Sequence, residues 1–134
     1  MTPIQITLLT GGALVAVNFW LGARISAYRR DFKVSVGDGG NESLLRRMRA
    51  QANFIENAPF FLILLASLEL SGAYRWGLVA LSVIFVLARI SHGIGMDAPE
   101  LRRWRAIGMI STALALAAIA IWAIVAGVGA LLGR

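Results

Sequence analysis

The stretch AIGMISTALALAAIAIWAIVAGVGALLG, residues 106–133, contains 28 consecutive residues without a charged side chain. An α-helix rises roughly 1.5 Å per residue, so about 20 apolar residues suffice to cross the roughly 30 Å of hydrocarbon in a bilayer. This stretch therefore predicts a transmembrane helix. Its small residues, including Gly129 and Gly133, are typical of a helix surface that packs closely against another helix.

The composition of the whole chain agrees with a membrane protein and excludes several other classes. Of its 134 residues, 58% are hydrophobic and 15% are charged, whereas charged residues make up about 25% of a typical soluble domain. The chain contains no cysteine, which excludes a disulfide scaffold, a cysteine-ligated metal and a cysteine nucleophile. The net charge of +6 suits basic loops beside a lipid bilayer. Because the apolar runs are too long for a soluble basic domain, we expect no nucleic-acid partner.

Three further apolar segments precede this stretch. Residues 4–27 are apolar apart from Arg24 and a few polar side chains, and residues 1–23 carry no charge. Residues 50–70 and 74–95 are apolar apart from a few ionisable or polar side chains. The sequence thus predicts an all-α, integral membrane four-helix bundle that forms a single domain over residues 1–134. We expect helices over about residues 4–28, 43–70, 74–95 and 99–132.

Local signals mark the starts of two of these helices. Asn41 or Ser43 can cap the second predicted helix, because their side chains accept hydrogen bonds from free backbone amides. The run from Asp97 to Glu100 has the spacing of a capping box, which would open the fourth helix.

Basic residues are concentrated in two of the connections between helices. Residues 28–49 hold six and residues 95–105 hold three, whereas the turn after the second helix holds only Arg75. Both basic connections lie at the same end of an antiparallel bundle. The positive-inside rule then places them, and any site beside them, in the cytoplasm and both termini on the opposite side. We predict a multi-pass integral membrane protein, with a bacterial inner membrane as its candidate location.

Ionisable side chains within membrane helices are costly unless they have partners, so each is a candidate for function. In the second predicted helix, Arg49, Asn53 and Glu56 share one face at spacings i, i+4 and i+7. The third helix places Arg89 and His92 near the same basic end. Together these residues predict a cationic pocket with one carboxylate, which suits an anionic or zwitterionic small molecule.

Structural roles can explain the same residues singly. Arg49 can extend to lipid head groups, and Glu56 can form an ion pair with Arg89 that joins the second helix to the third. His92 has no second histidine or cysteine nearby, so it suits packing, and we expect no metal. Glu69 lies near the opposite interface and receives no predicted role.

The second predicted helix also resembles that of a known family. Residues 49–61, RAQANFIENAPFF, contain the pattern Arg-x-Gln-x-Asn-x-x-Glu-x-x-Pro. This pattern resembles the second-helix signature of the MAPEG family, the membrane-associated proteins in eicosanoid and glutathione metabolism. The chain length, the four spans, the basic loop after the first helix and the arginines of the third and fourth helices are also similar to that family.

The resemblance implies a homotrimer that binds glutathione between adjacent subunits near the cytoplasmic face. Such a protein would conjugate the glutathione thiol to a lipophilic electrophile or reduce a lipid hydroperoxide. Arg103 would stabilise the thiolate, with Arg102 or Arg105 in its place if the register differs. Glu56 would meet the ammonium of glutathione, and Arg30 would reach a carboxylate. The other glutathione-binding positions that the resemblance implies are Arg49, Gln51, Asn53 and Arg89. We add His92 as a candidate binding residue because it lies one helical turn from Arg89.

Two departures from the family bear on the substrate. Asn57 replaces an aromatic residue found in several eicosanoid-processing members, and His92 with Gly93 stands where those members have a tyrosine-containing segment. An eicosanoid substrate is therefore not expected.

Two other functions are alternatives to a transferase or peroxidase. One is a small four-span, proton-coupled transporter that uses Glu56, which the surrounding arginines disfavour because they would repel a cationic substrate. The other is a MAPEG-like membrane protein without catalysis.

Overall fold

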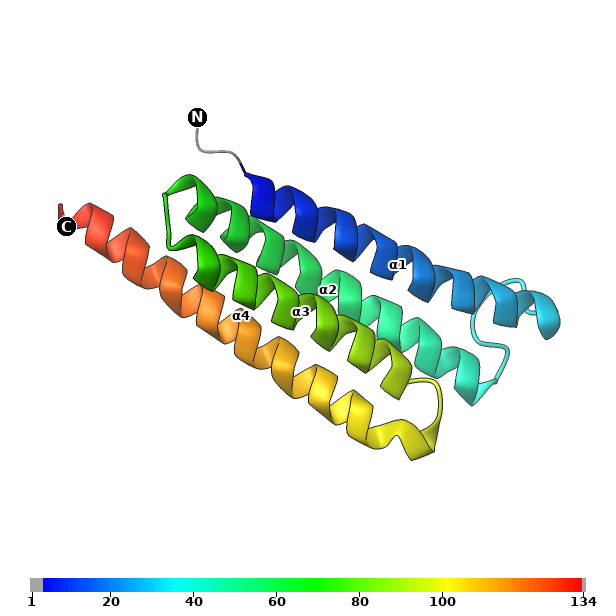
Figure 1. The fold of residues 1–134 in the computed structure, drawn as a ribbon. Helices are drawn as coiled ribbons and strands as arrows, with labels where there is room; N and C mark the ends of the chain where they lie inside the picture. Colours follow the sequence, from blue (N-terminus) through cyan, green and yellow to red (C-terminus); the bar gives the residue numbers. More distant parts are fainter. Residues whose placement is uncertain (1–3, 134) are drawn as a thin grey trace.

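The computed structural model describes residues 4–133 and contains four long helices. They are α1 (Gln5–Asp31), α2 (Glu42–Leu70), α3 (Arg75–Gly95) and α4 (Arg102–Leu131), with a 3₁₀-helix, η1 (Pro99–Leu101), before α4. Figure 1 shows the four helices side by side as an up-and-down bundle. The predicted all-α four-helix bundle is confirmed, and the described residues contain no strand.

All four helices are long and apolar enough to cross a membrane. Their antiparallel order divides the bundle into two ends, which are visible in Figure 1. The arginine-rich end holds the connection from α1 to α2 and the connection from α3 to α4. The turn end holds the short turn between α2 and α3 together with the start of α1 and the end of α4. The chain is therefore a multi-pass membrane protein.

The starts of α2 and α4 test the two predicted caps. At α2, the Asn41 side chain accepts a hydrogen bond from the Leu44 amide at 3.1 Å, so Asn41 is the cap. The predicted capping box at Asp97 is wrong. Ala98 precedes η1 without a side-chain cap, because the Asp97 carboxylate turns instead towards arginines of α1 and α2.

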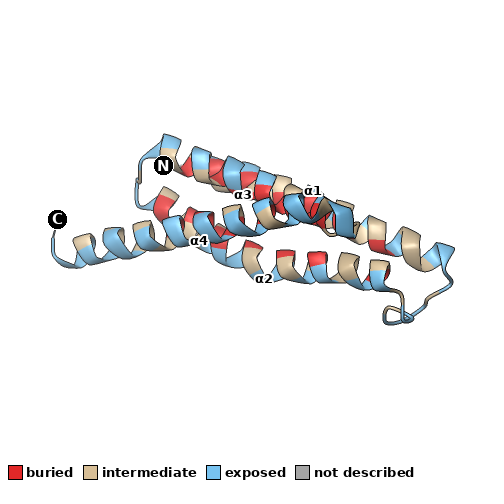
Figure 2. Cartoon of the chain, turned by 90° about the horizontal axis from the view of Figure 1, so that it is seen from below, coloured by how far each residue is buried: buried red, intermediate tan, exposed pale blue. Residues whose placement is uncertain are grey.

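The core is a narrow apolar seam along the bundle axis. Its centre is the stacked pair Phe61 and Phe85, whose ring centroids lie 4.0 Å apart, and Leu65 and Leu78 are fully buried. The buried residues of α4 fall on a single stripe of Gly108, Thr112, Ala115 and Ile119. Figure 2 shows that most of the remaining surface of α4 is exposed. Such exposed apolar surface suits a hydrocarbon environment.

Glycines allow α3 and α4 to approach closely near the arginine-rich end. A side-chain carbon at Gly108 would overlap the backbone of His92 and Ala88, and one at Gly95 would overlap the backbone of Arg105. Within the described part of this chain, nothing packs against Gly133, which lies beyond the end of α4.

Glu69, which had no predicted role, caps the start of α1 from the last turn of α2. Its carboxylate accepts hydrogen bonds from the backbone amides of Ile6 and Thr7, both at 2.8 Å, and from the Thr7 hydroxyl at 2.7 Å. The residue before α1, Ile4, offers no side-chain cap. The positive end of the helix dipole also stabilises a negative charge at this position. Glu69 therefore ties α2 to α1 at the turn end.

We expect Glu69→Ala to lower the free energy of unfolding by roughly 1–3 kcal/mol, because it leaves two helix-start amides without their acceptor. The measurement is unfolding of the detergent-solubilised protein with sodium dodecyl sulfate, followed by circular dichroism. Glu100→Ala, which removes an exposed acid at the other end, is the matched control and should change stability little. Equal losses in the two variants would contradict the capping role.

Candidate functional site

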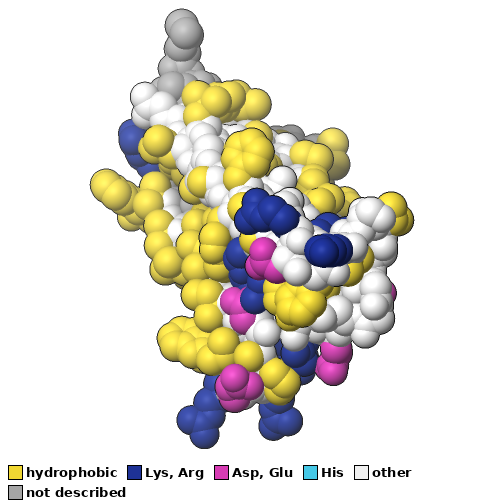
Figure 3. Space-filling model, turned by 90° about the vertical axis from the view of Figure 1, so that its right-hand side faces the viewer, with side chains coloured by type: hydrophobic (Ala, Val, Ile, Leu, Met, Phe, Trp, Pro, Cys, Tyr) yellow, Lys and Arg dark blue, Asp and Glu magenta, His cyan; other side chains and the backbone are white. Residues whose placement is uncertain are grey.

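The arginine-rich end brings together charged residues from all four helices and their connections. Figure 3 views the molecule towards this end and shows arginine or lysine side chains interspersed with acidic ones, with apolar surface on their flank. The sequence-predicted site residues lie in this half of the bundle, but they fall into two groups. One group is packed between helices, and the other is on the outer surface.

Asn53 and Arg89 form the centre of the packed group. The Arg89 guanidinium is fully buried, at 1% exposure. It donates to Asn53 Oδ1 on α2 at 2.8 Å and to Thr112 Oγ1 on α4 at 3.1 Å. The Thr112 hydroxyl in turn donates to the Gly108 carbonyl at 2.7 Å. Arg89 therefore links α2, α3 and α4 through neutral acceptors.

The ion pair between Glu56 and Arg89 that the sequence allows does not form within the chain. Glu56 is exposed, and Arg89 is held by Asn53 instead. The helical period explains this outcome. Glu56 follows Asn53 by three residues, which turns it about 60° around the α2 axis and away from α3.

Arg49, Glu56 and Arg103 make up the outer group. Arg49 and Glu56 lie on the exposed side of α2, while Ala50 and Phe54 on the opposite side are buried. Arg103 is exposed in the first turn of α4, as are Arg102 and Arg105. One chain by itself therefore does not enclose the predicted pocket. The polar face of α2 looks outward from the bundle.

Gln51 and His92 are held within the bundle by different neighbours. The Gln51 amide donates to Asn18 Oδ1 on α1 at 3.2 Å. His92 is buried on α3, where Gly108 of α4 packs against its backbone. Both residues therefore lie at helix contacts.

Arg30 lies apart from the other predicted residues. It is exposed near the end of α1 and is 4.0 Å from the Asp31 carboxylate. It also lines a shallow cleft of about 500 Å³, which is formed by the last turns of α1 and the following loop. Arg29, Lys33 and Ser35 border the same cleft, which is therefore strongly cationic.

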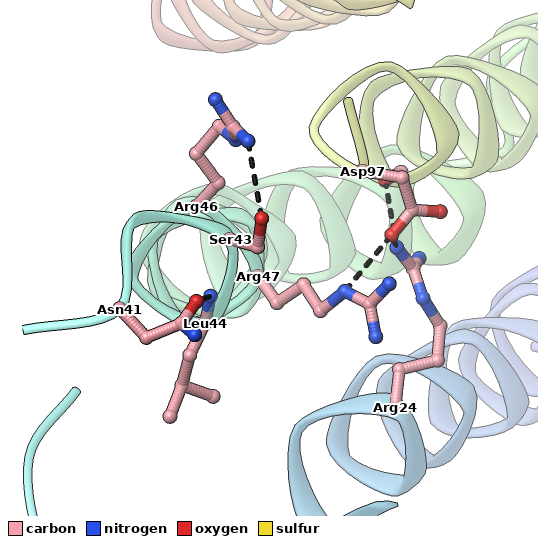
Figure 4. A network of polar contacts seen from close by, with 8 residues as sticks. Arg24, Asn41, Ser43, Leu44, Arg46, Arg47 and Asp97 are labelled. Atoms are coloured by element: carbon pink, nitrogen blue, oxygen red, sulfur yellow. Dashed lines mark hydrogen bonds and ion pairs between the residues drawn. The ribbon is translucent and has the colours of Figure 1, made fainter. Parts of the chain in front are cut away.

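A cluster around Asp97 joins three parts of the chain at this end, and the sequence did not reveal it. In Figure 4 the Asp97 carboxylate lies between Arg24 of α1 and Arg47 of α2. It pairs with the Arg24 guanidinium and with Arg47 Nε, the latter at 3.1 Å. Both guanidinium groups also lie over aromatic rings, Arg24 over Trp20 at 4.4 Å and Arg47 over Tyr28 at 4.7 Å. The cluster anchors the connection that leads into α4.

The sequence did not predict the contacts of three residues, namely Asn18, Thr112 and Asp97. Asn18 and Thr112 are polar residues inside otherwise apolar spans, and that signal predicts a hydrogen bond between membrane helices. No comparable signal indicates the ion pairs of Asp97, because its carboxylate pairs with arginines that are 73 and 50 positions earlier in the sequence.

We expect Asn53→Leu to lower the free energy of unfolding by roughly 1.5–3 kcal/mol, because a buried guanidinium then loses an acceptor. Asn57→Leu is the matched control, since Asn57 donates only to the Asn53 carbonyl of its own helix. It should lower stability by less than about 1 kcal/mol. Detergent-to-dodecyl-sulfate unfolding measures both, and similar losses would show that Asn53 does not support Arg89.

Comparison with known proteins identifies relatives that fit this architecture. The sequence model of the MAPEG family matches residues 7–125. The chain is also 32% identical over 88 residues to the inner membrane protein YecN of Escherichia coli strain K12, and the match covers 66% of this chain and 66% of that protein. YecN of Escherichia coli strain O6:H1 gives the same values. The four spans and this inner-membrane relative support a multi-pass protein of a bacterial inner membrane. The chain belongs to the MAPEG family.

Proposed function

We propose that this protein is a membrane-embedded glutathione-dependent transferase or peroxidase. The observation that carries the proposal is the outward-facing pair Arg49 and Glu56 on α2, in a member of the MAPEG family. Both side chains are exposed in the half of the bundle that holds the arginine clusters. Their charges are the two signs that a zwitterionic ligand requires.

The charges of glutathione match this surface. At neutral pH glutathione carries two carboxylates and one ammonium. Arginine suits carboxylates because its planar guanidinium donates two parallel hydrogen bonds. Glu56 has no ion-pair partner among residues 4–133, so its carboxylate is free to accept the ammonium. Arg49 lies about 10 Å further towards the arginine-rich end along α2.

The environment of Glu56 also supports an assembly of several copies. A charged side chain that faces lipid costs several kcal/mol or draws water and head groups towards it. A neighbouring copy that covers the exposed face of α2 removes this contact with lipid and walls a site for the ligand. We propose a homotrimer in which glutathione lies between adjacent copies, with Arg30 reaching one of its carboxylates.

The internal contacts would position this outer surface. Asn53 lies on the same side of α2 as Arg49 and Glu56, and its bond to Arg89 fixes the rotation of α2 against α3. Gln51 fixes the same stretch of α2 against α1. Because the surrounding helices hold α2 in this orientation, binding need not order the backbone first.

The proposed reaction uses the thiol that glutathione supplies, which agrees with the absence of cysteine from the chain. Arg103 stabilises the thiolate relative to the thiol, and the thiol proton passes to water. The sulfur then attacks an electrophilic carbon of a lipophilic acceptor, and a carbon–sulfur bond forms as a leaving group departs with its electron pair. Holding both reactants together contributes by proximity.

We also propose that the arginine-rich end faces the cytoplasm. Ten of the basic residues, from Arg24 to Arg49 and from Arg102 to Arg105, belong to this end of the bundle. Arg75 is the basic residue at the turn end among those that the structure describes. This distribution agrees with the positive-inside rule.

Glutathione binding tests the role of Glu56. We expect Glu56→Gln to weaken binding about 10- to 100-fold, because a charge-assisted hydrogen bond contributes roughly 1.5–3 kcal/mol. Isothermal titration of the protein in detergent measures the dissociation constant. Glu100→Gln should bind like the wild type. A wild-type protein that fails to bind millimolar glutathione would refute the proposed function.

Turnover of 1-chloro-2,4-dinitrobenzene tests the role of Arg103. We expect Arg103→Ala to lower kcat about 10- to 100-fold, because the loss of one charge-assisted contact to the thiolate raises the barrier by roughly 1.5–3 kcal/mol. Glutathione affinity should change by less than about threefold. Arg102→Ala and Arg105→Ala serve as position controls. If Arg103→Ala leaves kcat unchanged while a control variant lowers it, Arg103 is not the activating residue.

A further inference from the structure

A groove between α1 and α3 occupies the opposite half of the bundle from the proposed glutathione site. Its volume of about 630 Å³ lies within the range of roughly 300–1,000 Å³ that is usual for small-molecule sites. Leu8 and Leu9 of α1 and Val83 and Leu87 of α3 line it, and each is more than half exposed. The groove is thus apolar and open sideways to the surrounding hydrocarbon.

A single cation marks the mouth of the groove. Arg75, the first residue of α3, lines the groove, and its guanidinium makes a long hydrogen bond of 3.4 Å to Gln5 Oε1. Tyr74 and Trp76 beside it are 69% and 66% exposed. Exposed tyrosine and tryptophan at the end of a membrane helix mark the depth of the lipid head groups. Arg75 also lies at the positive end of the α3 dipole, which favours an anion.

Arg75 has no ion-pair partner among residues 4–133. All seven acidic side chains lie within residues 4–133, and Glu69 is the one near this end. Both of its oxygens already accept hydrogen bonds from Ile6 and Thr7 at the start of α1. The next acid along α2, Glu56, lies about 20 Å away along the helix. Glu69 therefore attracts Arg75 through space, but no ion pair with Arg75 forms in the described part of the chain. Arg75 can still donate hydrogen bonds to an anion from outside the chain.

A buried hydroxyl supplies a second polar feature inside the groove. Ser82 lines the groove and is 6% exposed, and its hydroxyl has no hydrogen-bond partner in the described part of the chain. It lies seven residues after Arg75, or about 10 Å deeper along α3. A plain hydrocarbon chain needs no such donor, whereas the ester carbonyls below a phospholipid head group accept hydrogen bonds.

We propose that this groove binds one acyl chain of an anionic glycerophospholipid, with the phosphate at Arg75 and the ester region towards Ser82. The order of charge, hydroxyl and apolar surface along α3 matches the order of phosphate, ester and chain in such a lipid. A second copy of the protein fits less well, because among residues 4–133 the acid at this end is Glu69, which already caps α1. The proposal is independent of the glutathione site, which lies at the other end of the bundle.

The test is lipid retention from bilayers of defined composition. The protein is reconstituted in equal amounts of dioleoyl phosphatidylglycerol and dioleoyl phosphatidylcholine, extracted gently, and its bound lipids are counted by native mass spectrometry. We expect the wild type to retain phosphatidylglycerol preferentially. Arg75→Gln should lower that preference about fivefold, the effect of one cation near the membrane surface. Lys33→Gln, which removes an exposed cation at the other end, should leave it unchanged.

Blocking the groove separates a specific lipid from general membrane lipids. Val83→Trp should remove one retained lipid per chain, while Leu114→Trp on the exposed side of α4 should remove none. The proposal is overturned if the wild type shows no head-group preference, or if Lys33→Gln lowers the preference as much as Arg75→Gln. It is also overturned if Val83→Cys, the sole cysteine of that variant, forms disulfides between copies in the bilayer, because a second copy then fills the groove.

Discussion

Burial of the Arg89 guanidinium is the constraint on which the rest of the structure depends. A cation that is 1% exposed within a membrane helix requires acceptors, since an unsatisfied buried charge costs several kcal/mol. The chain supplies neutral ones, Asn53 from α2 and Thr112 from α4. Three helices are thereby fixed in rotation as well as in position. Asn53 reaches Arg89 from the inner edge of the polar face of α2, so Arg49 and Glu56, which lie further round that face, are exposed.

Polar contacts near the two ends complete this frame. Asp97 joins α1, α2 and the connection into α4 through two arginines, and Glu69 joins α2 to the start of α1. In a bilayer, where lipid chains are as apolar as the helix surfaces, such contacts and close van der Waals packing hold helices together. The glycines at positions 95 and 108 provide the packing by letting the α3 and α4 backbones approach. The outer surfaces remain free for lipid, ligand or neighbouring copies.

The sequence predicts the fold well because hydrocarbon imposes simple rules. A run such as residues 106–133 has no stable alternative to a spanning helix, and the number and order of helices follow from four such runs. Side-chain partners are harder to predict. Helical spacing correctly groups Arg49, Asn53 and Glu56 on one face, but it does not reveal where the buried stripe ends. Asn53 lies just inside that boundary and Glu56 just outside it. The sequence therefore predicts a pocket between helices of one chain, whereas the structure has an outward-facing surface at these residues. The sequence around Asp97 indicates only a local helix cap, because nothing in the neighbouring residues identifies its distant arginine partners.

Chemical protection of a single introduced cysteine tests directly whether the outward face of α2 is the ligand surface. Because the chain has no cysteine, the variant Ala52→Cys carries a unique thiol on the exposed side of α2 between Arg49 and Glu56. Its alkylation by a maleimide can be timed with and without millimolar S-methylglutathione, which has no thiol of its own. A ligand on this face should slow alkylation of Ala52→Cys and leave Leu114→Cys on α4 unaffected. Equal alkylation rates with and without the analogue in both variants would contradict the claim that the outward face of α2 binds the ligand.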